Sequence, residues 1–181
     1  SNVYELSKSA AGSSGGASSA VAAGLLPFAD GTDQMGSCRG PAAYANIYGF
    51  RPTPGLISAD RTGQKLDLPI LTTPGCLART PNDMSILLDA IVGSDLLDKF
   101  SFDLNHSFQN QNLSDKDFSS LKIGWLSNMN GKYNIENNIL EVCENKLKDL
   151  EKININVESL NPKIDITKLW KSWTTLRAKS I

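Results

Sequence analysis

The sequence is poor in the residues that most often act as catalytic bases or metal ligands, with one histidine and three cysteines among 181 residues. The cysteines, at positions 38, 76 and 143, have neither the spacing of a metal site nor an even number for disulfides, so we expect no metal and a reducing, cytoplasmic setting. The single histidine, His106, falls in a polar stretch rich in Asn, Gln and Ser, which disfavours a thiol dyad with Cys38.

A charge excess of either sign is also missing, because 18 Lys and Arg oppose 19 Asp and Glu. No basic run or alternation of basic and aromatic residues is present, so nucleic acid is not an expected partner. Residues 9–29 carry no charge, but their first half is glycine and serine and only the second half is apolar, so we expect no membrane span.

What the sequence does contain is two glycine-rich blocks that each enclose a serine. The first block covers Ala11–Ala17 and contains Ser13, and the second covers Gly31–Ala43 and contains Ser37. Glycine- and serine-rich segments are commonly flexible linkers. Here the small apolar run Ala20–Leu26 lies between the blocks and is typical of a closely packed helix, which favours a buried segment over a linker.

The second block has the composition of an oxyanion-binding loop. Glycine permits positive φ and lets a substrate approach main-chain amides closely. Asp33 and Arg39 are the only charges between Gly31 and Ile47, and as a buried pair they would brace the loop, with direct contact to substrate as the alternative. We expect four main-chain amides to point into one concavity, those of Gln34, Met35, Gly36 and Ser37.

The two blocks together resemble the amidase signature family, whose members carry Gly-Gly-Ser-Ser-Gly-Gly-Ser followed by Gly-Thr/Ser-Asp-x-Gly-Gly-Ser-x-Arg-x-Pro-Ala-Ala. In this chain residues 11–17 read Ala-Gly-Ser-Ser-Gly-Gly-Ala, and residues 31–43 read Gly-Thr-Asp-Gln-Met-Gly-Ser-Cys-Arg-Gly-Pro-Ala-Ala. The likeness is strong to about residue 95 and looser beyond it, through Leu121–Trp125 and Leu169–Trp173. The chain therefore looks like an internal part of such an amidase.

The resemblance implies roles for the serines. Ser37 would be the nucleophile that attacks an amide carbonyl, and Ser13, held in a cis peptide, would relay protons to and from it. Ser14 would support the loop by hydrogen bonding. The family completes its triad with a lysine from well upstream, and Lys8 does not match that position, so the base is missing. The implied substrate is a small-molecule amide, no metal or organic cofactor is implied, and a homo-oligomer is left open.

Three positions depart from the family pattern. Ala11 and Ala17 replace a glycine and a serine, and Met35 replaces a glycine beside Ser37. Alanine at position 11 should be tolerated unless this position needs positive φ. Met35 keeps its main-chain amide, while its thioether would narrow the acyl pocket.

Three functions stay open. The leading one is an amidase that hydrolyses a carboxylic amide through an acyl-enzyme on Ser37. The second is a catalytically silent chain, a truncated product or a domain that acts by assembly, because the lysine is missing. The third is the amide-hydrolysing subunit of a tRNA-dependent amidotransferase. It is disfavoured because the segment Gly55–Gly75 lacks the longer glycine- and aromatic-containing stretch that such subunits usually carry.

The expected fold class is α/β, as part of a layered α/β/α sandwich around a mixed, mostly parallel sheet. We expect one partial domain with a catalytic core at 1–95, a polar loop or insertion at 96–120, and a strand-helix-strand-helix part at 121–181.

Within the catalytic core, Thr80 and Pro81 predict a helix start. A strand at 121–126, a helix at about 135–150 and a strand around 153–157 form a unit with parallel strands. The last amphipathic helix carries an apolar stripe that we expect to face the core, namely Leu169, Trp170, Trp173 and Leu176.

Overall fold

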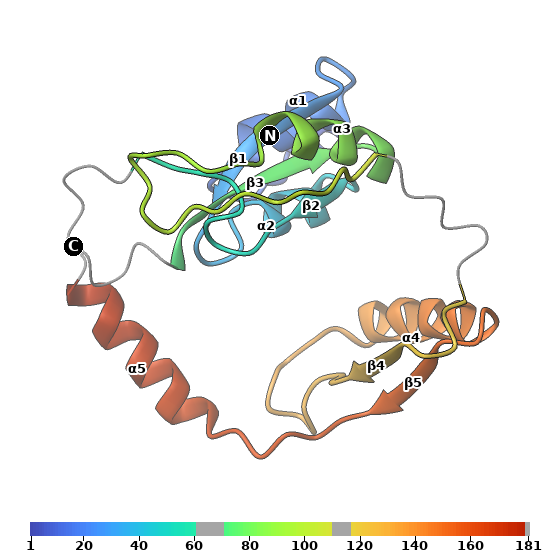
Figure 1. The fold of residues 1–181 in the computed structure, drawn as a ribbon. Helices are drawn as coiled ribbons and strands as arrows, with labels where there is room; N and C mark the ends of the chain where they lie inside the picture. The colour runs from blue at the N-terminus through green and yellow to red at the C-terminus, as the bar shows by residue number, and fades with distance from the viewer. Residues whose placement is uncertain (61–70, 110–116, 180–181) are drawn as a thin grey trace. The chain divides into compact units, whose positions relative to one another are not determined.

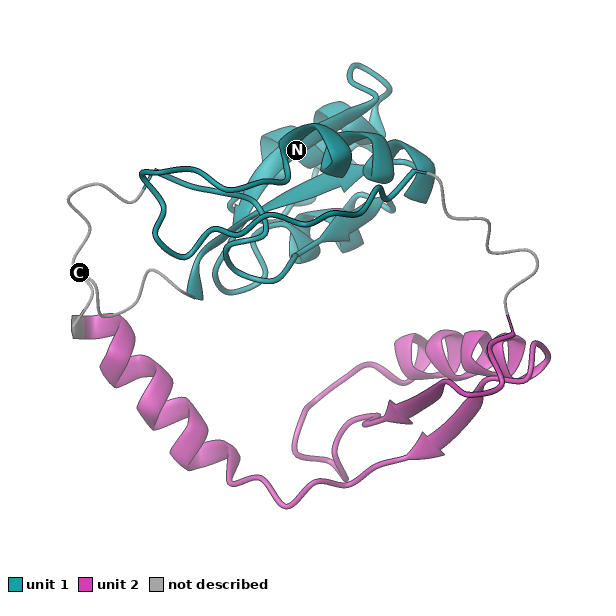
Figure 2. Ribbon diagram, in the orientation of Figure 1, with its two compact units in different colours: residues 1–111, 180 teal, residues 112–179, 181 magenta. Residues whose placement is uncertain are grey.

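The computed structural model describes residues 1–60, 71–109 and 117–179, and the chain divides into two compact units (Figures 1 and 2). Unit 1 extends from Ser1 to Gln111, and unit 2 begins at Asn112. The boundary between the units therefore falls inside the polar segment that we expected at 96–120. The segment Gly55–Gly75, which we used to disfavour an amidotransferase role, lies partly outside the described residues.

Unit 1 is built on a three-stranded sheet. Its strands β1 (Phe28–Asp33), β2 (Tyr48–Phe50) and β3 (Thr73–Ala78) lie in the order β1-β3-β2. Both pairs are antiparallel, and the last residue of β1 lies opposite the first residue of β3. Because β3 has a partner strand on each side and is buried along almost all of its length, it is the centre of the unit.

Helices cover both faces of this sheet (Figure 1). Successive side chains of a strand point to opposite faces, so Gly75 and Cys76 of β3 face different layers. Cys76 joins a buried core with α3 (Pro81–Ile91), formed by Ile57, Cys76, Ala78, Met84, Leu87 and Leu88. On the other face, α1 (Gly15–Ala22) contacts β1 and β3, and α2 (Arg39–Tyr44) contacts β2.

Helix α1 differs from its prediction at both ends. It begins at Gly15, earlier than the apolar run, and it ends at Ala22 instead of continuing to Leu26. Gly24 adopts a positive φ of 76°, and the Leu25 amide donates back to the carbonyl of Ala20, which is the geometry of a helix C-terminus. The predicted small-residue helix is therefore real but shorter, and Leu25 is exposed.

The start of α3 is as predicted. Thr80 is the N-cap, and its hydroxyl accepts a 3.0 Å hydrogen bond from the Asp83 amide. Pro81 is the first helical residue, where its missing N–H costs nothing. This capped start directs the apolar side of α3, with Met84 and Leu87, onto the sheet.

Unit 2 contains the predicted strand-helix-strand unit. Strands β4 (Lys122–Trp125) and β5 (Asn156–Ser159) pair in parallel, and α4 (Asn137–Glu151) connects them. The last helix, α5 (Ile166–Lys179), also forms. Its expected core stripe is wrong in this structure, because Leu169, Trp170 and Leu176 are each 46% exposed or more.

The expected mixed α/β class is confirmed, but the share of parallel pairing is smaller than expected. Among the described strands, only β4 and β5 pair in parallel. In unit 1, β1 and β2 run in the same direction with α2 between them in sequence, yet the later strand β3 is inserted between the two and is antiparallel to both. Within the described part of the chain, no helix has the length and apolar character needed to cross a membrane.

The close contact of α2 with β2 leads to a prediction about Gly49. A Cβ at this position would lie 2.5 Å from Cβ of Ala42 and 2.9 Å from the carbonyl oxygen of Cys38. We expect Gly49→Ala to lower the free energy of unfolding by about 1–3 kcal/mol, because α2 must move off the sheet.

Gly40→Ala is the matched control, since a Cβ there meets nothing within 4 Å and alanine favours the helix by up to about 1 kcal/mol. Urea unfolding of both variants tests this, and equal stabilities would contradict it.

Candidate active site

The structure brings the two serine blocks together. Ser14 precedes α1, and its main-chain N–H donates a 3.1 Å hydrogen bond to the carbonyl oxygen of Ser37. The peptide bond between Gly12 and Ser13 is cis, which is the conformation that the family resemblance implies. Ser13 is exposed and Ser37 is half-buried. Two segments more than 20 residues apart in sequence thus share one edge of unit 1.

Where the two serine blocks meet, the sheet beneath them has two facing glycines and therefore no side chains. Gly31 of β1 and Gly75 of β3 are directly opposite each other in the antiparallel pair. A Cβ at Gly31 would lie 2.7 Å from Ser14 Oγ and 3.0 Å from Cys38 Sγ, and a Cβ at Gly75 would lie 3.1 Å from the same sulfur. The two glycines therefore form a notch that admits one side chain from each serine block.

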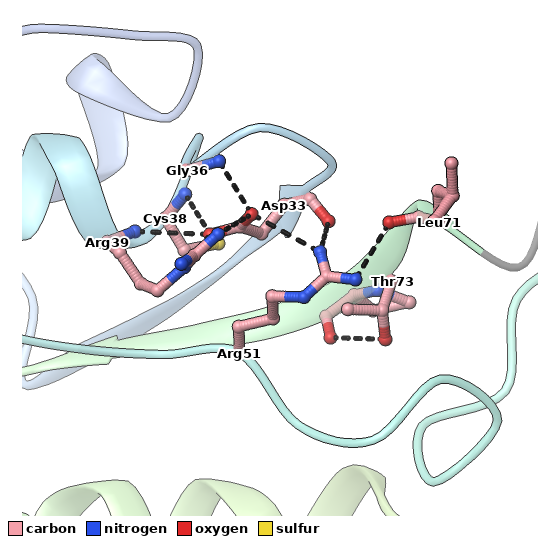
Figure 3. A network of polar contacts seen from close by, with 8 residues as sticks. Asp33, Gly36, Cys38, Arg39, Arg51, Leu71 and Thr73 are labelled. Carbon is pink, nitrogen blue, oxygen red and sulfur yellow. Dashed lines mark hydrogen bonds and ion pairs between the residues drawn. The ribbon is translucent and has the colours of Figure 1, made fainter. Parts of the chain in front are cut away.

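Asp33 organises the loop that carries Ser37, the segment Gln34–Cys38, which we call the Ser37 loop (Figure 3). The Asp33 carboxylate is fully buried and accepts hydrogen bonds from the main-chain amides of Gly36 (2.8 Å), Cys38 (3.3 Å) and Arg39 (3.4 Å). The Arg39 guanidinium adds a bidentate contact through Nε and Nη2, each at 3.0 Å. The predicted bracing pair is therefore present, and it is made of one buried and one half-exposed partner.

These donors also set the charge state of Asp33. Burial by itself would raise the pKa of this carboxyl, since it removes the charged form from water. The hydrogen bonds from Arg39, from the Gly36 amide and from the amides of Arg39 and Cys38 outweigh that effect and hold the pKa well below its usual range. Asp33 is therefore a permanent anion under the Ser37 loop.

The Gly36 amide has a different partner from the one we predicted. It donates to Asp33 Oδ1, so its role in the structure is loop support and not that of an unengaged oxyanion donor. Gly36 has a φ of 103°, which explains why glycine is required beside Ser37. Met35 is 48% exposed, so its thioether lies at the surface of unit 1. The amides of Gln34, Met35 and Ser37 stay predicted donors.

The sequence left open whether position 11 needs a positive φ, and the structure shows that it does. Ala11 has a φ of 58°, a region that costs an L-residue roughly 1–2 kcal/mol relative to the right-handed region. The replacement of glycine by alanine in the first block is therefore accommodated with local strain. Beside it, a hollow of about 600 Å³ opens next to Ser13, with a mostly polar lining that includes Ser7, Lys8, Ser9 and Ser19.

Neither Lys8 as an alternative base nor Cys38 with His106 as an alternative nucleophile and base has a suitable environment. Lys8 is 69% exposed and forms an ion pair with Glu5 at 2.9 Å, so its amine is not desolvated as a lysine base would be. Cys38 is fully buried, and burial raises the pKa of its thiol, which keeps the thiol neutral. His106 is exposed and packs edge-on against Phe108. Among the described residues, no group of three or more His, Cys, Asp or Glu is placed to hold a metal ion.

Sequence reasoning missed Arg51. This residue follows β2, and its Nη1 donates to the main-chain oxygen of Asp33 at 2.7 Å and lies 3.4 Å from Oδ1 of the same residue. Its Nη2 donates to the carbonyl oxygen of Leu71 at 2.9 Å. The available signals were that Arg51 lies in the stretch of strong family likeness and is the next cation after Arg39 along the chain. Neither signal says where its side chain reaches.

The pKa of Asp33 gives a pH-dependent prediction. A carboxyl whose folded pKa lies below its unfolded value of about 3.9 stabilises the protein above that value, and the contribution is lost as the pH falls toward the folded pKa. We expect Asp33→Asn to lower the free energy of unfolding by about 3 kcal/mol at pH 7, because two guanidinium groups lose their anionic partner and one of the two acceptor oxygens becomes a donor.

The difference between the native chain and Asp33→Asn should shrink when unfolding is measured below pH 4. Asp30→Asn is the control, since Asp30 lies in the same strand with an exposed side chain and its substitution should change little. A pH-independent difference would show that charge on Asp33 does not hold the Ser37 loop.

Comparisons with known proteins support the family resemblance that the two serine blocks carry. The family model described as Amidase matches residues 1–174. Among curated proteins, the chain is 42% identical over 108 residues to a subunit of glutamyl-tRNA(Gln) amidotransferase from Thermus thermophilus, covering 60% of this chain and 22% of that protein. It is 36% identical over 160 residues to the protein of the same name from Pseudomonas putida, covering 88% and 32%. The chain thus spans about a third or less of the length of these relatives.

Solved structures show the same relationship in three dimensions. A bacterial aryl acylamidase of the amidase signature family superimposes with a TM-score of 0.83 at 26% identity, over 95% of this chain and 35% of that one. A 6-aminohexanoate cyclic dimer hydrolase gives a TM-score of 0.78 at 28% identity, over 88% and 33%. Because the family model covers nearly the whole chain and the fold agrees, this chain belongs to the amidase family.

Proposed function

We propose that Ser37 is the nucleophile of an amidase that hydrolyses the C–N bond of a carboxylic amide. The observation that carries the proposal is the junction of the two serine blocks. The Ser14 amide bonds to the Ser37 carbonyl, and Ser14 Oγ and Cys38 Sγ share the notch of Gly31 and Gly75. This arrangement holds the residues next to Ser13 and Ser37 together, as a hydroxyl-to-hydroxyl proton relay requires.

The reaction proceeds in two halves. Ser37 Oγ attacks the carbonyl carbon, and its proton passes through Ser13 to the leaving nitrogen as the C–N bond breaks and the amine departs. Water then attacks the acyl ester, returns a proton to Ser37 and releases the acid. The amides of Gln34, Met35 and Ser37 stabilise the oxyanion in both halves, while Gly36 and Asp33 keep the loop in shape.

The base is the part that the described residues around the two serine blocks do not supply. Lys8 is the only lysine among the first 60 residues, and its side chain is 69% exposed and forms an ion pair with Glu5. A lysine acts as a base only when it is desolvated or placed near other cations. The proposal therefore assigns the base to a lysine elsewhere in the complete gene product, as the resemblance implies.

A second candidate function is that of the glutamyl-tRNA(Gln) amidotransferase for which the curated relatives are named. It is favoured by the identity to those relatives, and as one component of that enzyme the protein would work with partner chains. The sequence argument against it used Gly55–Gly75, and ten residues of that segment, 61–70, are outside the described part of the structure. The two candidates share the acyl-enzyme on Ser37 and differ in the acceptor of the released nitrogen.

The nucleophile is tested in the complete gene product that contains these 181 residues. We expect Ser37→Ala to abolish labelling by a fluorophosphonate probe and to lower kcat/KM on a panel of small amides by about 10³-fold or more. Ser19→Ala is the control, because the Ser19 hydroxyl donates to the carbonyl of Ser1 and this variant should label normally. The 181-residue chain alone is expected to show no turnover, for want of a base. Labelling and turnover that survive in Ser37→Ala would remove the proposal.

The two candidates are separated by their products. An amidase releases acid and amine from simple carboxylic amides without any other chain or RNA, and this is the outcome that we expect from the complete gene product. Incubation with glutamyl-tRNA(Gln) and glutamine is the parallel assay, with the aminoacyl group analysed by chromatography. Formation of glutaminyl-tRNA, together with negligible hydrolysis of the amide panel, would establish the second candidate and overturn the first.

A further inference from the structure

We infer that Arg51 is a positioning residue that fixes the Ser37 loop against the end of the sheet through two main-chain carbonyls. The inference rests on the proposed function only in treating Ser37 as the nucleophile. Among the described residues, the polar contacts of the Arg51 guanidinium are with Asp33 and Leu71, so it acts on the loop through Asp33.

The position of Arg51 explains its reach. Arg51 follows β2, which does not neighbour β1 because β3 lies between them. Its guanidinium extends across the start of β3 and donates to the carbonyl of Asp33 on one side and to the carbonyl of Leu71 on the other (Figure 3). Asp33 ends β1, and Leu71 lies two residues before β3 begins at Thr73.

Both carbonyls lie at the limit of the strand ladder. The pair Asp33 and Thr73 is the last described one between β1 and β3, and Leu71 lies outside this described ladder. A main-chain carbonyl that is removed from water requires a donor. The planar fork of one guanidinium supplies two donors in fixed directions, and it closes this end of the sheet with a single side chain.

Arg51 and Arg39 differ in how they hold Asp33. Arg39 contacts the carboxylate, and its side chain is 54% exposed. Arg51 bonds mainly to the main chain, and its side chain is only 21% exposed. The role of Arg51 therefore depends on the shape of the guanidinium and not only on its charge.

Arg51 restrains the residues around Ser37 through the carboxylate of Asp33. With its carbonyl held by Arg51 and Oδ1 3.4 Å from Nη1, Asp33 has a fixed main chain and a fixed side chain. Its two oxygens bind the amides of Gly36 and Cys38, the residues on either side of Ser37. Loss of the fork should therefore loosen these two amides before it loosens the rest of unit 1.

The test is amide hydrogen exchange of the 181-residue chain, followed residue by residue by NMR. We expect Arg51→Lys to raise the exchange rates of the Gly36 and Cys38 amides at least tenfold, while amides of α3 keep their rates. Lysine retains the charge, but one ammonium group cannot replace two donors in a fixed fork. Arg51→Gln removes the charge as well and should give at least the same local increase.

Arg79→Lys is the matched control. Arg79 follows the other end of β3 and also donates to two carbonyls, those of Val21 (3.1 Å) and Leu26 (3.5 Å). Its substitution should speed exchange near the end of α1 and leave Gly36 and Cys38 unchanged.

Two results would overturn the inference. One is native exchange of Gly36 and Cys38 in Arg51→Lys, which would show that charge alone suffices. The other is an equal rise at Gly36, Cys38 and α3, which would show only general destabilisation. Because exchange requires no turnover, either result leaves the assignment of Ser37 as nucleophile untouched, and an unreactive Ser37 leaves the role of Arg51 untouched.

Discussion

The Ser37 loop owes its shape to one carboxylate that is withdrawn from water. An isolated buried charge costs several kcal/mol, so the chain must surround Asp33 with donors, and those donors are the amides of the loop and two guanidinium groups. The loop cannot rearrange without leaving this charge unpaired. Two guanidinium groups thus face one carboxylate.

Close packing on the sheet also helps to position the Ser37 loop. Gly31 and Gly75 face each other across β1 and β3, and their missing side chains allow Cys38 and Ser14 to sit directly on the sheet. The hydrogen bond from the Ser14 amide to the Ser37 carbonyl then joins the blocks. Electrostatics thus sets the conformation of one loop, and the glycine notch sets its distance from the other serine block.

Local signals in the sequence predicted most of what is local in the structure. The cap at Thr80 depends on neighbouring residues and is found, and the parallel pairing of β4 with β5 follows from the strand-helix-strand order that the local patterns predict. The insertion of β3 between β1 and β2 depends on pairs such as Phe28 with Ala78, and the reach of Arg51 to Asp33 and Leu71 spans 18 and 20 residues. No local pattern encodes these contacts. The need for a positive φ at position 11 was left open and the stripe of α5 was expected in the core, because both depend on the surrounding structure. The roles of Ser13 and Ser37 came from family resemblance and stay predictions.

The state of Asp33 is the most direct measure of the central claim that a buried, hydrogen-bonded anion shapes the Ser37 loop. It can be read from the side-chain carboxyl carbon of Asp33 by NMR as the folded 181-residue chain is titrated with acid. The account predicts that this carbon keeps the chemical shift of a carboxylate well below pH 3.9, the ordinary midpoint of an aspartate, for as long as the chain stays folded. A midpoint at or above about 3.9 in the folded chain would contradict it.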